Sequence, residues 1–270
     1  MSGIISKQIK NRNLLFYFDA ANIKSYIGSG NIGYELSTGS AVPGSEITLL
    51  PGVTWSSSNC GVMSFNGTYS PQEIAYNVDS WITCGDRISK LGLTFPITLE
   101  AWINPKKLNG STAGPVYGIF ALDSPEQYPG NYYGVDIQLS ANDGTDTHSF
   151  SGGYYDGTGS GPDSRKNATT SNRPVICGKW NHVVAVVIGI NNILLYVNGY
   201  LMTTSLSGTG GSLAWSGGLG KTVIGKQGGY YKYLFNGDIA MVRAYNSALS
   251  NINITQNYNT HALRFGLEII

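Results

Sequence analysis

The sequence has 270 residues, of which 12% are charged, whereas an average soluble protein has about 25%. Seventeen Lys and Arg against sixteen Asp and Glu residues give a net charge of +1. This balance excludes the strong positive field by which proteins bind nucleic acids or anionic membrane surfaces. The longest apolar run, residues 183–190, is far shorter than the roughly 20 residues that span a bilayer, so we expect no membrane insertion.

Three cysteines, Cys60, Cys84 and Cys177, lie far apart in the sequence and form no CxxC pair. An odd number at this spacing encodes neither a disulfide framework nor a zinc site. We therefore expect buried free thiols in a protein made in a reducing cytosol. The first residues contain no apolar segment of the signal-peptide type, which agrees with that expectation.

Glycine-rich turns, drawn from 36 glycines, divide the chain into short apolar segments. Runs with alternating or β-branched apolar residues between such turns are typical of strands. In chain order, the predicted strands are residues 14–19, 97–103, 116–122, 132–139, 182–190, 192–197, 221–226 and 238–245. The sequence therefore predicts an all-β protein.

The valine-rich segment 182–190 is apolar on both of its alternating faces. Such a strand is covered on both sides, which favours two packed sheets. The turn at residues 189–192 and the Asn198-Gly199 pair, which is typical of a type I′ turn, predict antiparallel hairpins on either side of the next strand. The polar residues 144–174 are interpreted as a long insertion within one domain.

One segment, residues 247–259, has helical character, with Ser247 or Ser250 as its N-cap. We expect a short helix near the C-terminus. The fold class predicted in this way is an antiparallel two-sheet β-sandwich with one short C-terminal helix.

Acidic residues are too scattered for the paired carboxylates of a glycosidase, because none of the six glutamates lies within ten residues of another. Glu100, in the predicted strand 97–103, is interpreted as a partly buried residue paired with Lys or Arg. His182 is interpreted as a packing or turn residue, and no GxSxG motif is present. We expect no enzymatic activity; a glycan hydrolase using Glu100 or Asp136 is a minor alternative.

Oxygen ligands for calcium could come from Asp136, Asp143 and Asp146, although these residues do not match an EF-hand loop. An Asx turn at residues 142–144 is the simpler interpretation. We therefore expect no cofactor, with calcium as the alternative.

Tyrosine pairs beside Gly or Asn are typical of exposed sugar-binding or protein-binding loops. An alternative is that one tyrosine of each pair faces the core and the other covers a strand edge. The candidate glycan-binding residues are Tyr132, Tyr133, Tyr154, Tyr155, Tyr230 and Tyr231.

Two longer motifs resemble a known family. Residues 180–199 (WNHVVAVVIGINNILLYVNG) resemble the central hairpin of laminin-G-like, concanavalin A-like jelly-roll domains, and residues 235–250 (FNGDIAMVRAYNSALS) resemble their closing strand. The predicted strand 97–103 resembles an inner strand of the same family. The resemblance implies a sandwich whose members bind glycans or proteins, with a minority acting as hydrolases.

Residues 13–30 and 256–267 are similar to segments of tailed-bacteriophage virion proteins. This resemblance implies a structural virion protein, a capsid decoration or fibre component, that binds the major capsid protein or other virion proteins and further copies of itself. A free or tail-borne adhesin for host surface glycans is the alternative.

Three parts of the chain are expected: an N-terminal arm at 1–12, a jelly-roll domain at 13–256 and a C-terminal tail at 257–270. The arm and the tail would anchor the domain in an assembly. The expected assembly contacts are Ile4, Ile5, Ile9, Arg264, Phe265, Leu267, Ile269 and Ile270.

Overall fold

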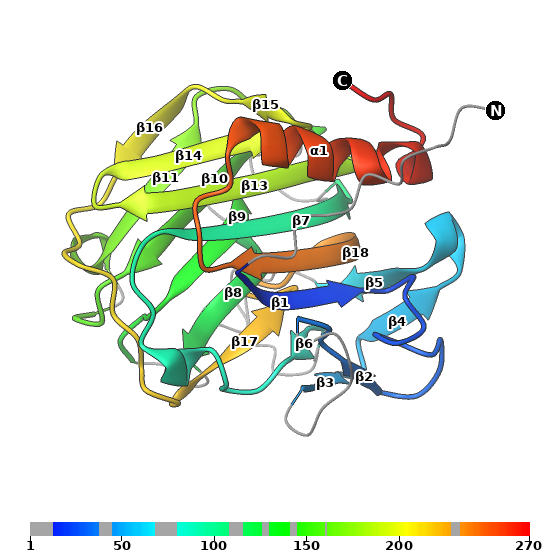
Figure 1. The fold of residues 1–270 in the computed structure, drawn as a ribbon, viewed down its shortest axis with the longest axis horizontal. Helices are drawn as coiled ribbons and strands as arrows, with labels where there is room; N and C mark the ends of the chain where they lie inside the picture. Colours follow the sequence, from blue (N-terminus) through cyan, green and yellow to red (C-terminus); the bar gives the residue numbers. More distant parts are fainter. Residues whose placement is uncertain are drawn as a thin grey trace.

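Two antiparallel sheets are stacked face to face in the computed structural model, and a helix lies across the outside of one of them (Figure 1). This confirms the predicted sandwich with one C-terminal helix. The structure describes residues 13–37, 45–67, 80–107, 116–125, 130–140, 145–159, 161–227 and 233–270.

The first sheet contains eight of the described strands. Its order is β15 (Tyr200–Leu201), β14 (Asn192–Val197), β13 (Asn181–Gly189), β7 (Ile97–Pro105), β18 (Asn236–Tyr245), β5 (Val62–Asn66) and β4 (Val53–Ser56), with β1 (Leu14–Asp19) also paired to β18. All pairs are antiparallel. The first and last described strands are therefore direct neighbours.

The second sheet contains ten of the described strands. Its order is β16 (Thr204–Ser207), β11 (Arg165–Thr170), β10 (Thr147–Tyr155), β9 (Val135–Ser140), β8 (Val116–Pro125), β17 (Gly220–Ile224), β6 (Ile82–Thr83), β3 (Glu46–Leu49) and β2 (Ile32–Tyr34), with β12 (Val175–Ile176) paired to β10. We call the two sheets the eight-stranded and the ten-stranded sheet.

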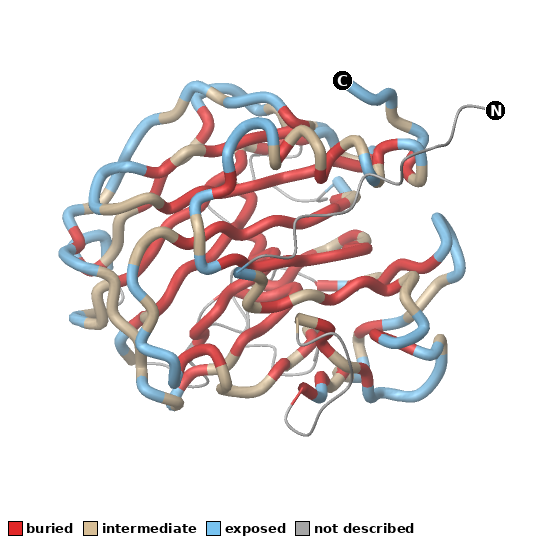
Figure 2. Tube along the Cα trace, in the orientation of Figure 1, coloured by how far each residue is buried: buried red, intermediate tan, exposed pale blue. Residues whose placement is uncertain are grey.

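Apolar side chains from both sheets fill the space between them, and buried residues follow the inner strands in Figure 2. On β13, Val183, Ala185 and Val187 point into this core, whereas Val184 and Val186 point to the opposite face. Both sets are buried, as the sequence predicts. The second face is covered not by another sheet but by the C-terminal helix.

Helix α1 (Asn251–His261) begins at Ser250, whose Oγ accepts a hydrogen bond from the backbone N–H of Asn253. One of the two predicted N-caps is thereby confirmed. The helix places Ile254 and Tyr258 against the outer face of the eight-stranded sheet. No helix in the described part of the chain is long and apolar enough to cross a membrane.

Both predicted hairpins are present. Gly189 pairs with Asn192, and Val197 pairs with Tyr200. The connecting Asn198 has φ 51° and is followed by a glycine that also has a positive φ, as a type I′ turn requires.

The interpretation of residues 144–174 as an insertion is wrong, because β10 and β11 lie there and form the inner part of the ten-stranded sheet. The sequence of β10, THSFSGGYY, lacks the β-branched pattern of the other strands. Its Gly152 lies so close to the opposite sheet that a Cβ there would be 2.6 Å from the Cβ of Ala185. The small residues of β10 thus allow the two sheets to approach each other closely. Because these residues lack an alternating apolar pattern, the sequence does not predict the strand.

The cysteines are free, as expected. Cys84 is buried and Cys177 is half-buried, but Cys60 is exposed because it ends the short 3₁₀ turn Ser58–Cys60 on the surface. The expectation of buried thiols is therefore wrong for Cys60.

Candidate glycan-binding edge

The outer face of the ten-stranded sheet is polar where β9, β10 and β11 run side by side. The apolar residues of β9 enter the core, so Asp136 and Gln138 lie on the opposite face. Gln138 pairs with Ser151 on β10, which pairs in turn with Thr169 on β11, and the Ser151 and Thr169 hydroxyls are 2.8 Å apart. Three neighbouring strands thus carry hydrogen-bonding groups on one face.

Asp136 is the centre of a buried cluster on this face. Its Oδ2 accepts hydrogen bonds from the Tyr155 hydroxyl at 2.9 Å and from Gln227 Nε2 at 3.2 Å. Burial raises the pKa of Asp136 to about 6, although these two hydrogen bonds act in the opposite direction. Within the described residues, Asp136 Oδ1, Gln138 Oε1 and Asn167 Oδ1 are buried without a hydrogen-bond partner. These acceptors are buried, so the cluster belongs to the interior of the domain.

Residues 131–132, which precede β9, are hydrogen-bonded to the loop that follows β10. The Tyr132 backbone N–H donates to the Gly159 carbonyl at 2.9 Å, and the Gly157 N–H donates to the Tyr132 carbonyl at 3.1 Å. The Tyr132 ring meets the Tyr155 ring edge-on, with centroids 5.2 Å apart. The side chain of Asn131 adds a hydrogen bond to the Gly157 carbonyl at 2.6 Å. A rigid backbone therefore supports the next residue, Tyr133.

Tyr133 is partly exposed, and its ring contacts the backbone of Gly157. Gly157 has φ +77°, and a Cβ there would be 2.6 Å from Tyr133 Cε1, so the close approach depends on glycine. Trp215 is held nearby, because the Gly134 N–H donates to the carbonyl of the preceding residue, Ala214. Trp215 is only partly exposed, because it packs against the core and its indole N–H donates to the Leu93 carbonyl at 2.6 Å.

Polar side chains surround these rings. Asp156 accepts hydrogen bonds from the Thr158 hydroxyl at 2.6 Å and from the Gly211 N–H at 2.7 Å, which joins the loop after β10 to the loop after β16. We call this corner the Tyr133 edge, and it comprises Asn131, Tyr133, Asp156, Thr158 and Trp215. It places a partly exposed tyrosine ring next to amide, carboxylate and hydroxyl groups.

The structure brings three of the predicted tyrosines together, Tyr132, Tyr133 and Tyr155, and of these only Tyr133 is partly exposed. The exposed fractions are 6% for Tyr132, 0% for Tyr154 and 4% for Tyr155, so the expectation that these three are exposed is wrong. The reason is that β10 is an inner strand: Tyr154 points into the core against Phe95, with ring centroids 4.9 Å apart. Tyr230 and Tyr231 lie outside the described residues.

The predicted calcium ligands have separate roles where they are described. Asp136 belongs to the buried cluster, whereas Asp146 is exposed and pairs with Lys107 at 3.0 Å. Asp143 lies outside the described residues. Across the described ranges, no three His, Cys, Asp or Glu side chains are placed to hold a metal ion.

Glu100 is the centre of a second buried network, on the outer face of the eight-stranded sheet. It accepts hydrogen bonds from Arg243 Nη1 at 2.9 Å, His182 Nε2 at 3.0 Å and Asn257 Nδ2 at 2.8 Å. Tyr245 donates a longer bond of 3.2 Å. The pairing of Glu100 with arginine is confirmed, and the packing role of His182 agrees with this arrangement. All these side chains are buried, so the network joins helix to sheet rather than binding a ligand.

Sequence reasoning did not find Arg243 as the partner of Glu100. A signal was present, because Glu100 is the single charge of its apolar strand and Arg243 is the only basic residue of the closing strand 238–245. In the structure they are directly opposed on β7 and β18.

Two expected assembly contacts, Arg264 and Phe265, are used inside the domain. Arg264 donates to Asp19 Oδ1 at 3.0 Å and to the Asn59 carbonyl at 2.7 Å. Phe265 is buried and stacks on Trp102, with centroids 4.5 Å apart. The C-terminal segment begins inside helix α1 and continues in the 3₁₀ helix Ala262–Phe265, so this part is not a free tail.

The remaining predicted assembly residues are more accessible. Leu267 is half-buried against the same aromatic cluster, and Ile269 and Ile270 are exposed by 61% and 43%. The three N-terminal isoleucines, like the whole arm 1–12, lie outside the described residues.

Solved structures of other proteins share the fold at low sequence identity, and three serve as examples. The receptor-binding domain of botulinum neurotoxin type G is 13% identical, with a TM-score of 0.59 over 93% of this chain and 52% of that one. The binding domain of Paraclostridial mosquitocidal protein 1 is 16% identical, with a TM-score of 0.61 over 95% and 56%. The chain therefore spans about half the length of these toxin chains.

The third structure is domain 4 of the extracellular arabinanase of Geobacillus stearothermophilus, in complex with arabinotriose. It is 18% identical, with a TM-score of 0.54 over 91% of this chain and 98% of that domain. No curated protein sequence matches the chain.

The sequence itself gives a stronger assignment. A model of the concanavalin A-like lectin/glucanases superfamily matches residues 77–255, more than half of the chain. This range contains the central hairpin, both sides of the Tyr133 edge and the closing strand β18. With the two stacked antiparallel sheets of the structure, this match shows that the chain belongs to the concanavalin A-like lectin/glucanases superfamily.

Proposed function

We propose that the protein is a non-enzymatic carbohydrate-binding domain that holds a glycan at the Tyr133 edge. The observation that carries the proposal is the partly exposed Tyr133 ring, which contacts Gly157 beside the polar side chains of Asn131, Asp156 and Thr158. Carbohydrates present alternating apolar CH faces and hydroxyl groups. A fixed aromatic ring next to hydrogen-bonding groups complements both.

The edge is pre-organised for binding. Hydrogen bonds from the Tyr132 backbone and the Asn131 side chain fix the segment on one side of the ring, and the Asp156 carboxylate fixes the loop on the other. A site that is already ordered loses little conformational entropy when a ligand binds. The bound glycan would therefore keep most of its interaction energy.

A solved structure supports this class of ligand. The arabinanase domain was determined with arabinotriose. The positions of the two buried carboxyl groups also favour binding without catalysis. Glu100 is buried beneath helix α1 and accepts a hydrogen bond from Asn257 of that helix. Asp136 contacts Tyr155 but no second carboxyl group among the described residues.

A virion role, with the major capsid protein or further copies of this chain as partners, stays a prediction from the sequence resemblance. Glycan binding is the function that we favour, because the surface just described suits it. An adhesin attached to a virus particle would combine the virion role with glycan binding.

Screening the purified protein on a glycan array, followed by calorimetric titration of the best ligand, tests the proposal. We expect Tyr133→Ala to weaken binding at least tenfold, which corresponds to about 1.4 kcal/mol. Tyr200→Ala is the matched control, because Tyr200 is 58% exposed on β15, in the other sheet. Absence of any glycan ligand, or equal binding by both variants, would overturn the proposal.

A further inference from the structure

Residues 251–270, which comprise helix α1, the 3₁₀ helix and the residues after it, lie on the outer face of the eight-stranded sheet (Figure 1). We call them the clasp. Thr98 fixes the chain just before the clasp, because its hydroxyl donates to the Ser247 carbonyl at 2.7 Å and accepts from the Leu249 N–H at 3.2 Å. The next residue, Ser250, is exposed and extended. The clasp can therefore move about Ser250 while β18 stays in place.

His261 attaches the end of helix α1 to β18 through a contact that requires one protonation state. Arg243 Nη2 and His261 Nε2 are 2.8 Å apart. Arginine has no acceptor, so Arg243 donates this hydrogen bond and His261 Nε2 carries no proton. A proton on Nε2 would replace the hydrogen bond by a contact between two cations. The attachment therefore depends on a neutral His261.

The charged and titratable groups that face His261 come from the elements packed against the end of the helix. They are Arg243 on β18, Glu100 on β7, His182 on β13 and Arg264 on the 3₁₀ helix, and Tyr17 on β1 lies beside Arg243. Glu100 favours a proton on His261, but its Oε1 already accepts hydrogen bonds from Arg243 and His182. Burial and the Arg243 charge outweigh Glu100 and lower the pKa of His261 to about 3.

The apolar part of the attachment is aromatic. The Phe265 ring contacts both Trp102 and Trp180, with centroids 4.5 and 4.4 Å apart. Tyr258 stacks on Trp102 as well, at 5.6 Å. Both tryptophans are buried, and the clasp contributes Tyr258, Ala262 and Phe265 to the cluster that surrounds them. Removal of the clasp would therefore place both indole rings in contact with water.

We propose that the clasp is released by acid: protonation of His261 detaches it from the eight-stranded sheet and exposes Trp102 and Trp180, while both sheets stay folded. Release frees His261 as completely as global unfolding does, and a local opening costs less free energy than global unfolding. As the pH falls, the released state is therefore populated first. Release is independent of glycan binding, because the Tyr133 edge belongs to the ten-stranded sheet.

The expected size of the effect follows from proton linkage. The pKa of His261 is 6.5 in water and about 3 in the attached clasp. Protons therefore bind the released state more tightly, and the equilibrium constant for release should rise roughly 200-fold between pH 7 and pH 4.

Hydrogen exchange with mass spectrometry, corrected for the intrinsic exchange rate at each pH, measures this equilibrium in the full chain. We expect helix α1 to lose protection roughly 200-fold between pH 7 and pH 4, while β9 and β10 stay protected. Equal protection of α1 at the two pH values would overturn the proposal. Simultaneous loss of protection in α1, β9 and β10 would overturn it too, because that is global unfolding.

Substitutions of His261 test whether this side chain is the trigger. His261→Gln retains an acceptor for Arg243 and cannot be protonated, so α1 should stay protected at pH 4. His261→Lys places a permanent cation beside Arg243, so α1 should lose protection already at pH 7. Thr260→Gln and Thr260→Lys are the matched controls, because Thr260 is the preceding helix residue and is exposed. Equal protection of α1 in His261→Lys and Thr260→Lys would contradict the proposal, and circular dichroism should show that each variant keeps its sheets.

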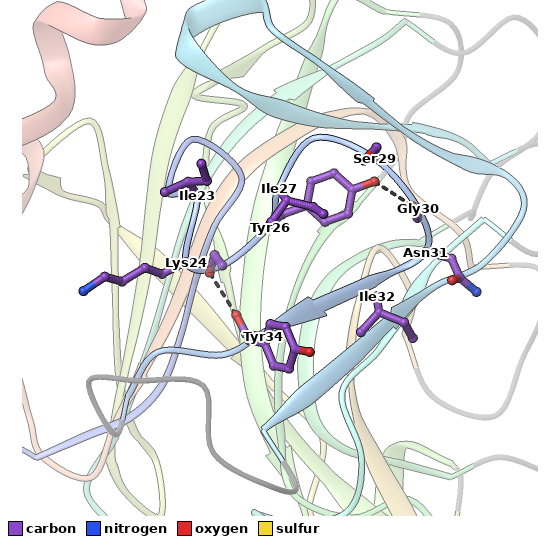
Figure 3. Close-up of a pocket in the computed structure, with 10 residues that line it drawn as sticks. Ile23, Lys24, Tyr26, Ile27, Ser29, Gly30, Asn31, Ile32 and Tyr34 are labelled. Carbon is purple, nitrogen blue, oxygen red and sulfur yellow. Dashed lines mark hydrogen bonds between the residues drawn. The ribbon is translucent and has the colours of Figure 1, made fainter.

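A dye that binds exposed apolar surface, anilinonaphthalene sulfonate, reports the exposed tryptophans. Its fluorescence should rise between pH 7 and pH 4 in the unchanged protein but not in His261→Gln. The loop between β1 and β2 borders an open pocket of about 490 Å³ that contains Ile23, Ile27 and Ile32 (Figure 3). Dye in this pocket gives a constant background, because no His, Asp or Glu is among the described residues that line it. A rise that Ile27→Ser abolishes would assign the signal to the pocket and contradict release of the clasp.

Discussion

Glu100 shows how one buried carboxylate can join three parts of the chain. Its ligands come from β13, β18 and helix α1, and each donates a hydrogen bond to it. Burial alone would raise the pKa of Glu100, but the neighbouring Arg243 guanidinium and the hydrogen bonds from His182 and Asn257 outweigh it and hold the pKa at about 2. The carboxylate therefore stays ionised inside the protein.

Replacing Glu100 by Gln leaves the Arg243 charge buried without a counterion. We expect Glu100→Gln to lower the free energy of unfolding by about 3–5 kcal/mol, measured by urea denaturation. Glu46→Gln, at an exposed position, should change it little. Adding Arg243→Met to Glu100→Gln should recover part of the loss; a double variant that is less stable than the single one would contradict the ion-pair explanation.

At the scale of elements, strands rich in branched residues were predictable, and strands built from small residues were not. The bounds of β1 were predicted without error, because its apolar pattern ends at Asp19. β10 was missed, since its Gly and Ser side chains are selected by the distance between the sheets, which local sequence does not reveal. The positions of the candidate tyrosines were unpredictable for the same reason. Which tyrosines lie together, and which are buried, depends on which strands become neighbours in the sheet.

Helix α1 offers a test of capping. Ser250→Ala removes the acceptor for the Asn253 N–H, and we expect it to lower the free energy of unfolding by about 1 kcal/mol. Ser250→Asp retains an acceptor at this position and should stay near the original stability. The control is Ser205→Ala on the exposed strand β16, which should have little effect. A loss as large in the control as in Ser250→Ala would show that the effect is unrelated to the cap.

For the whole molecule, buried titratable groups with opposite effects govern acid stability. Burial and the adjacent Arg243 lower the pKa of His261 to about 3, so its contribution to the free energy of unfolding is present above pH 6.5 and is lost as the pH falls toward 3. The contribution of Glu100 to the free energy of unfolding is lost between pH 4.5 and 2. Asp136 has a pKa raised to about 6, so it stabilises the folded state most below pH 3.8, and this stabilisation is lost as the pH rises to 6.

We therefore expect the free energy of unfolding to change little between about pH 6 and 4.5, where His261 and Asp136 compensate, and to fall steeply below about pH 4. Urea denaturation across this range measures it. Asp136→Asn removes the opposing contribution, so stability should then fall continuously from pH 6 downward. An Asp136→Asn profile that remains flat from pH 6 to 4.5 would contradict the compensation.

The position of β18 has a consequence for how the chain folds. This strand joins β7 on one side to β1 and β5 on the other, and β1 pairs with no other strand of the described part, so the eight-stranded sheet stays in three pieces until residues 236–245 have been synthesised. Translation proceeds at about 5–20 residues per second, so β7 waits roughly 7–30 s for its neighbour after it has been made. During that interval the strand edges of β7, β5 and β1 that later pair with β18 are open to other chains, and cellular chaperones should act at this stage.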